Sequence, residues 1–138
     1  MAEAVKPVKR SSCEWSSPPD NPILKRTEVH VWRVLLDQTP EVVHRLRNIL
    51  SEDELTRAGR FRFSRDKEHF IVARGYLRTL LGQYLNLTPG KLNFSYNDYG
   101  KPGLDSAHHN SRLSFNISHS HDLALYAVPI DRRVGVDV

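Results

Sequence analysis

Three short polar motifs lie in a fixed order in the last third of the chain. The first is Gly100-Lys101-Pro102, the second is the sequence FNISHS at residues 115–120, and the third is GVDV at residues 135–138. A lysine on a turn, hydrogen-bonding groups at a strand end and an aspartate inside a strand could line one cleft. A cleft with those three groups suits a phosphorylated ligand, because phosphate oxygens bind cations, donors and metal ions.

Asp137 is the candidate metal ligand. Aspartate is depleted in strands, and this one lies between Val136 and Val138, where an ionised carboxylate needs a cation to offset its lost hydration. Mg²⁺ fits best, since it is usually held by one or two carboxylates together with substrate phosphates. A strand position that faces solvent is the alternative interpretation.

The other two motifs also have a functional and a purely structural interpretation. Lys101 on a rigid loop, and Asn116, Ser118 and His119 at a strand end, have the chemistry to hold phosphate oxygens. The same residue types are ordinary in β-turns and in strand ends that satisfy their own backbone. Neither motif decides the question alone.

The histidines and the single cysteine are candidate zinc ligands. His108, His109, His119 and His121 form two close pairs, but the chain has only Cys13 and no HExxH helix, which disfavours zinc. One cysteine excludes an internal disulfide, so we expect a reducing, cytoplasmic setting. No apolar run is long enough for a membrane span, and residues 1–12 lack the apolar region of a signal peptide.

Helical periodicity dominates the first two thirds of the sequence. Residues 27–36 read as a first strand, and Thr39 followed by Pro40 predicts the start of a short helix. Ser51 and Glu54 fit a capping box that opens a second helix. Ser64 is expected to cap a third and longest helix, which ends near residue 86 and packs an apolar face on a sheet.

Strand periodicity follows that helix. The expected strands are residues 92–96, 113–117, 123–128 and 134–138, with a hairpin turn at 129–132. Helices followed by consecutive strands indicate an α+β domain with a mainly antiparallel sheet packed against the long helix. Residues 1–24, rich in serine and proline, are expected to be a disordered tail, which leaves residues 25–138 as the domain.

Basic residues exceed acidic ones by 20 to 16, and many of them gather between residues 57 and 78. The alternatives for this basic stretch are a phosphate-binding rim and a solvated helix face. A nucleic-acid-binding module is disfavoured because no RNP-like, zinc-finger or helix-turn-helix pattern accompanies it. We therefore expect neither nucleic acid nor a membrane as a partner. The basic stretch comprises Arg57, Arg60, Arg62, Arg65, Lys67, Arg74 and Arg78.

The ordered motifs, together with the stretch at residues 60–85, resemble the larger, surfactin-synthetase type of 4′-phosphopantetheinyl transferase. The resemblance covers roughly residues 29–138. It implies Mg²⁺-dependent transfer of phosphopantetheine from coenzyme A to a serine hydroxyl of an acyl or peptidyl carrier protein. Such attack on phosphorus requires charge neutralisation on the oxygens more than covalent assistance.

The resemblance also implies a role for each motif residue. Asp137 would be the catalytic Mg²⁺ ligand on the coenzyme A pyrophosphate, and Arg57 would contact the 3′-phosphate. The residues expected to border or hold the nucleotide are Lys101, Pro102, Asn116, Ser118 and His119.

The resemblance is to the first half of a pseudo-dimeric enzyme whose active site lies between two similar halves. In that family GVDV is commonly followed by glutamate, and a later helix with a Trp…Lys-Glu motif supplies another ligand and the general base. We therefore expect a C-terminal half to be absent and the chain to be a fragment, a truncated product or a half completed by another half-domain or by homodimerisation. A non-catalytic half-domain that binds coenzyme A or a carrier protein is the alternative function.

Overall fold

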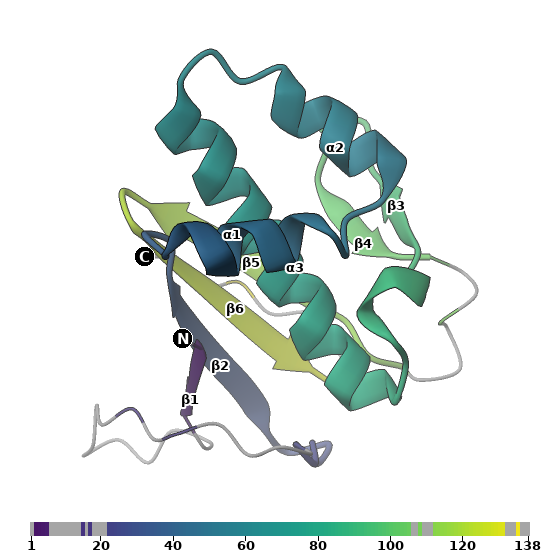
Figure 1. The fold of residues 1–138 in the computed structure, drawn as a ribbon. Coiled ribbons are helices and arrows are strands. Elements are labelled where there is room, and N and C mark those ends of the chain that lie inside the picture. The colour runs from purple at the N-terminus through teal and green to yellow at the C-terminus, as the bar shows by residue number, and fades with distance from the viewer. Residues whose placement is uncertain are drawn as a thin grey trace.

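The computed structural model describes residues 2–5, 15, 17, 22–105, 108, 112–131 and 135, with only the backbone described for residues 2–5. Helices and strands alternate less regularly than in a βαβ protein, because three helices follow one another before the last strands (Figure 1). The elements are β1 (Ala2–Val5), β2 (Val29–Leu35), α1 (Pro40–Arg47), α2 (Glu52–Gly59), α3 (Ser64–Leu85), the 3₁₀ helix η1 (Pro89–Lys91), β3 (Phe94–Tyr96), β4 (Pro102–Leu104), β5 (Asn116–Ser120) and β6 (Leu123–Pro129).

The main sheet has four strands in the order β1-β2-β6-β5, and each neighbouring pair is antiparallel. Trp32 lies opposite Tyr126 in the β2–β6 pair, and Ser118 lies opposite Leu125 in the β5–β6 pair. β3 and β4 form a separate antiparallel hairpin. The predicted α+β class with a mainly antiparallel sheet is confirmed.

Helix α3 lies across one face of the sheet. Helices α1 and α2 contact α3 on its side away from the sheet (Figure 1). Leu77 and Leu81 of α3 are fully buried, as are Trp32 and Tyr126 on the sheet, and together they form much of the core. The Tyr126 hydroxyl donates a hydrogen bond of 2.6 Å to the backbone carbonyl of Ala73. The prediction that the long helix packs its apolar face on the sheet is therefore confirmed.

The two helix starts before α3 follow their sequence signals. The Thr39 hydroxyl accepts from the Val42 amide, with Pro40 at the first helical position. At α2 both halves of the capping box are present: the Ser51 hydroxyl accepts from the Glu54 amide, and the Glu54 carboxylate accepts from the Ser51 amide at 2.8 Å. These side chains satisfy amides that have no partner inside the helix.

The long helix ends as predicted but starts at Ser64, the residue that was expected to cap it. Asn86 closes it in the left-handed region, at φ 55°, a conformation that asparagine tolerates. At the other end, Phe63 occupies the cap position without a side-chain hydrogen bond, and Ser64 is already helical. The prediction that Ser64 caps the helix is wrong, since its backbone has turned into the first helical turn.

The strands differ from the expected ranges in several places, and β3 begins at Phe94, two residues later than expected. β4 was not expected, because its Pro-Gly-Leu sequence has no strand period, yet it pairs with β3 in the hairpin. β5 begins at Asn116, and Leu113 makes only an isolated bridge with Ile130. Residues 2–5 form an edge strand inside the segment expected to be a disordered tail. Apart from Gly135, the expected strand at 134–138 lies outside the described residues, and so does Arg132 of the expected turn.

Candidate functional site

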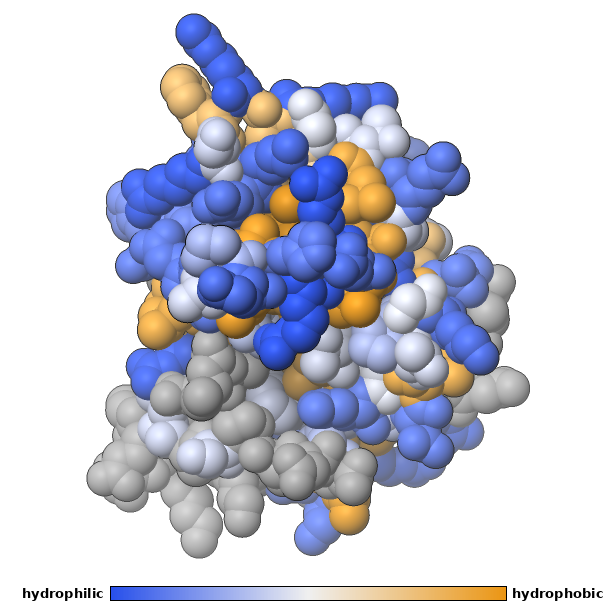
Figure 2. Space-filling view, viewed as in Figure 1, coloured by the Kyte–Doolittle hydropathy of each residue, from blue (hydrophilic) through white to orange (hydrophobic). Residues whose placement is uncertain are grey.

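The motif residues come from three elements that meet beside α3. Lys101 and Pro102 lie at the end of the β3–β4 turn, Arg57 lies on α2, and residues 116–119 lie on β5. Three pockets open between these elements: a helix pocket, a hairpin pocket and a histidine pocket. Figure 2 shows that the face on which α1 and α2 lie is mostly hydrophilic, with hydrophobic side chains visible among the polar ones.

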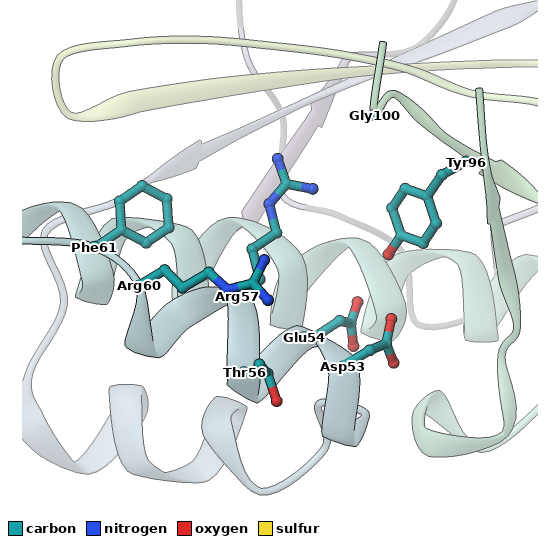
Figure 3. A pocket seen from close by; sticks show the side chains of 8 residues that line it. All are labelled: Asp53, Glu54, Thr56, Arg57, Arg60, Phe61, Tyr96 and Gly100. Atoms are coloured by element: carbon teal, nitrogen blue, oxygen red, sulfur yellow. The ribbon is translucent and has the colours of Figure 1, made fainter. Parts of the chain in front are cut away.

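The helix pocket lies between α2 and the β3–β4 hairpin (Figure 3). Arg57 enters it from α2, and the Tyr96 ring faces it from β3, while Gly100 of the turn closes one side. Phe61 and Arg60 complete the wall beside Arg57. The turn that carries Lys101 and the helix that carries Arg57 therefore face the same opening.

The hairpin pocket lies between the β3–β4 hairpin and residues 113–116 of the chain. Its lining includes Tyr96, Lys101, Pro102, His108 and Asn116. Its surface combines polar side chains with the hydrophobic ring of Phe115 and side chain of Leu113. A planar heteroaromatic group with polar edges fits such a lining.

The histidine pocket lies between α3, α2 and β5. Its lining includes Arg57, Arg65, His69, Pro102, His119 and His121. Ile117 and His119 lie on one side of β5, as strand alternation requires, and His121 follows in the turn after the strand. Asp66 is the acidic member of the lining, so cationic and titratable groups outnumber it.

The three pockets adjoin because they share lining residues. Arg57 lines the helix and histidine pockets, Tyr96 lines the helix and hairpin pockets, and Pro102 lines the hairpin and histidine pockets. The structure thus brings Arg57, Lys101, Pro102, Asn116 and His119 around one connected surface. Ser118 lines none of these three pockets, since alternation puts it on the strand face opposite His119. Asp137 lies outside the described residues.

Lys101 is held on a closed turn. The Asn97 side-chain oxygen accepts from the amides of Tyr99 and Lys101, both at 2.9 Å. The Asn97 amide donates to the Lys101 carbonyl at 3.1 Å, and Gly100 adopts φ +78°, which glycine permits without strain. The lysine side chain itself is exposed, so its charge projects from a fixed base.

Glu54 fixes the wall between the helix and hairpin pockets. Its carboxylate is buried and accepts hydrogen bonds from Arg78 Nε at 2.6 Å and from Arg74 Nη1 at 3.1 Å. Arg74 Nη1 also donates to the Tyr96 hydroxyl at 2.7 Å, and Arg78 Nη1 donates to the carbonyls of Pro89 and Leu92. One carboxylate thereby links α2, α3, η1 and β3.

The basic residues between 57 and 78 differ in burial. Arg74 and Arg78 are buried ion-pair partners of Glu54, and Arg74 also lines the histidine pocket. Arg57, Arg60 and Arg65 are exposed and line pockets as well. The capping box was predicted, but the second role of Glu54 was not; the signal for that role was the pair of arginines at i, i+4 on an apolar helix face. Neither alternative for the whole stretch was therefore complete.

A hydrogen-bonded pair that includes one residue of the histidine pocket, His69, was also missed. His69 Nε2 and Asp37 Oδ1 are 2.6 Å apart, with Asp37 in the loop after β2. The hydrogen bond from His69 holds the pKa of the Asp37 carboxyl below its usual value. Residues 32 positions apart in sequence give no spacing signal for such a pair.

The described residues do not contain a metal site of their own. Among them, no group of three or more His, Cys, Asp or Glu side chains could hold a metal ion. The expected ligand, Asp137, is not one of the described residues, so its metal binding stays a prediction. Within the same part of the chain, no helix has the length and apolarity needed to cross a membrane.

Comparison with known proteins supplies a family. The family described as "4′-phosphopantetheinyl transferase, N-terminal" matches residues 37–130, more than half of the chain. The chain is 44% identical over 124 residues to "4′-phosphopantetheinyl transferase HetI" of Nostoc sp., an alignment that covers 90% of this chain and 52% of that relative.

Two eukaryotic relatives match a shorter stretch. The human "L-aminoadipate-semialdehyde dehydrogenase-phosphopantetheinyl transferase" is 32% identical over 91 residues, which cover 64% of this chain and 29% of the relative. A "Phosphopantetheinyl transferase" of Thraustochytrium sp. is 30% identical over 94 residues, which cover 68% and 32%. This chain therefore spans about half the length of the first of these relatives and about a third of the other two.

Proposed function

Because the chain belongs to the 4′-phosphopantetheinyl transferase family, we propose that the whole protein transfers 4′-phosphopantetheine from coenzyme A to a carrier protein. The acceptor is a serine hydroxyl of an acyl or peptidyl carrier protein, and the other product is adenosine 3′,5′-bisphosphate. The observation that carries this proposal is the connected surface formed by the three pockets. It brings two cations, Arg57 of α2 and Lys101 of the β3–β4 turn, together with His119 of β5 where a nucleotide with several phosphates would bind.

In this proposal the hairpin pocket holds the adenine. Asn116 and the backbone around Pro102 supply polar groups there, while the Phe115 ring supplies an apolar surface. The histidine pocket holds the 3′-phosphate, with Arg57 and His119 as contacts. Lys101 lies at the hairpin pocket, where its ammonium can neutralise a phosphate of the same nucleotide.

Asp137 is the proposed Mg²⁺ ligand. Bound to the pyrophosphate of coenzyme A, the metal would neutralise charge that builds up on the phosphate oxygens. The chain's own residues bind and orient the nucleotide, and the carrier's serine approaches from the open side. We also place the reaction in the cytoplasm, because a chain with one cysteine suits a reducing compartment.

The first test is coenzyme A binding by calorimetry. Lys101→Glu replaces a phosphate contact with a like charge and should weaken binding by ~1–3 kcal/mol. The matched control is Lys91→Glu, an equally exposed lysine in η1 that lines none of the three pockets. Equal affinities for the two variants would remove Lys101 from the site.

The second test is transfer, followed by the mass of an apo carrier protein supplied with coenzyme A and Mg²⁺. We expect the full-length protein to add the phosphopantetheine mass and its Asp137→Ala variant to lose the addition while remaining folded. This chain alone should show negligible transfer, since it spans about half of its relative's length. Coenzyme A binding without transfer by any longer form would favour the alternative, a non-catalytic binding half-domain.

A further inference from the structure

We propose that His69, held by Asp37, is a third phosphate-contacting side chain of the histidine pocket and makes binding of the 3′-phosphate depend on pH. The inference rests on the proposed function, because it assigns that phosphate to this pocket. His69 belongs to none of the three sequence motifs. Its position on α3 brings a third element to the phosphate, besides α2 with Arg57 and β5 with His119.

The geometry of the pair fixes the imidazole. His69 Nε2 lies 2.6 Å from Asp37 Oδ1, and the His69 side chain is only 14% exposed although the carboxylate is 62% exposed. A carboxylate accepts hydrogen bonds, so Nε2 is the nitrogen that carries a proton in the neutral ring. Within the described part of the chain, Nδ1 has no hydrogen-bond partner, and His69 lines the pocket.

That arrangement makes Nδ1 a switch between two roles. In the neutral ring Nδ1 bears a lone pair, which repels phosphate oxygens. When the ring takes up a second proton, Nδ1 becomes a donor and the ring becomes a cation, so a charge-assisted hydrogen bond to phosphate becomes available. Histidine side chains generally make this change near neutral pH.

The surroundings favour an anion as the ligand. Arg57 and Arg74 line the pocket from α2 and α3, and His121 lines it from the turn after β5. Asp37 offsets the charge of the His69 ring from outside the pocket, while Asp66 is the acidic side chain inside it. The other charged or titratable side chains that line the pocket are Arg57, Arg65, Asp66, Arg74, His119 and His121.

The test compares two nucleotides that differ by one phosphate, adenosine 3′,5′-bisphosphate and adenosine 5′-monophosphate. Both are titrated into this chain and into its His69→Gln and Asp37→Asn variants at pH 6.0 and pH 8.0. We expect His69→Gln to bind the bisphosphate about tenfold more weakly at pH 6.0, with little change at pH 8.0, and to bind the monophosphate unchanged. Asp37→Asn should show a smaller loss of the same pattern, because its amide keeps the hydrogen bond but not the charge.

The matched control is His44→Gln, an exposed histidine on α1 that lines none of the three pockets. This variant should bind both nucleotides with wild-type affinity at both pH values. Wild-type affinity in His69→Gln, or an equal loss for both nucleotides at both pH values, would overturn the proposal. If Lys101→Glu weakens coenzyme A binding while His69→Gln does not, only this inference fails. If His69→Gln behaves as expected and no transfer is found, only the transferase proposal fails.

Discussion

The half-buried hydroxyl of Tyr84 connects the long helix to the sheet. Tyr84 Oη lies 2.8 Å from Trp32 Nε1 and 2.6 Å from His30 Nδ1, so α3 is tied to two residues of β2. An indole nitrogen only donates, which leaves the hydroxyl proton for His30. His30 Nδ1 accepts that proton only while it is itself unprotonated, and burial lowers the pKa of His30. The contact therefore favours neutral His30.

The first prediction is that stability falls in mild acid because of His30. Its pKa is lower in the folded protein than the ordinary value of 6.5, so below that value the unfolded chain takes up a proton that the folded chain resists. The contribution of His30 to stability is complete when the pH is above its pKa in the unfolded chain. It is lost as the pH falls toward the lower pKa that His30 has in the folded protein. The midpoint of urea unfolding should be lower at pH 5.5 than at pH 7.5. His30→Gln should reduce this difference between the two unfolding midpoints, and His44→Gln should leave it unchanged. An unchanged difference in His30→Gln would show that His30 is not its cause.

At the scale of elements, α2 is attached to α3 by charge more than by apolar contact. Its buried residues are Glu54 and Ala58, and the Glu54 carboxylate pairs with Arg74 and Arg78 of α3. Removing three charged groups from water costs free energy. The Glu54 carboxylate and the two guanidinium groups offset this cost because they hydrogen-bond to one another in place of water. The same carboxylate is linked to the β3–β4 hairpin through Arg74 and Tyr96.

The second prediction follows from that dependence. Glu54→Gln leaves two buried guanidinium groups without a counter-charge and should lower the free energy of unfolding by ~3–5 kcal/mol. Glu52→Gln is the matched control, because Glu52 is an exposed acid in the first turn of the same helix, and its change should stay within ~0.5 kcal/mol. Chemical denaturation measures both. Similar losses for the two variants would show that the buried network does not hold α2.

The third prediction concerns the approach of α1 to α3. A Cβ atom added at Gly75 would lie 2.7 Å from the Leu46 Cβ, closer than two carbon atoms pack. Gly75→Ala should therefore push the helices apart and cost ~1–3 kcal/mol. Gly59→Ala, at the end of α2, has no atom within 4 Å of the added Cβ and should be neutral or slightly stabilising. Thermal unfolding distinguishes them, and a neutral Gly75→Ala would show that α1 adjusts freely.

At the scale of the whole molecule, local signals in the sequence predicted elements better than they predicted contacts. Thr39, the Ser51 capping box and Asn86 act within one helix turn, and all three mark boundaries that the structure has. β4 was missed because its strand character comes from pairing with β3, which no local period reveals. The cap at Ser64 was misplaced for the related reason that serine favours several positions near a helix start.

The candidate site shows the same division. Lys101 and His119 were named from motifs and Arg57 from the family resemblance, but only the packing of α2 and β5 against α3 shows that their pockets adjoin. His69 and the second role of Glu54 depend on partners at least 20 residues away in sequence, so spacing could not find them. The role of Asp137 stays a prediction, because that residue is not among those described.

The tie between Tyr84 and Trp32 also gives the protein an optical probe of its own fold. Trp32 is 2% exposed, and its ring meets the Tyr84 ring edge-on at 6.2 Å between centroids. Fluorescence of an indole in such a dry environment shifts to longer wavelength when water reaches it. The chain has two tryptophans, and Trp15 is only partly buried, so a Trp15→Phe protein would emit from Trp32 alone. The wavelength of its emission maximum would then show, without any attached dye, when α3 separates from the sheet during unfolding.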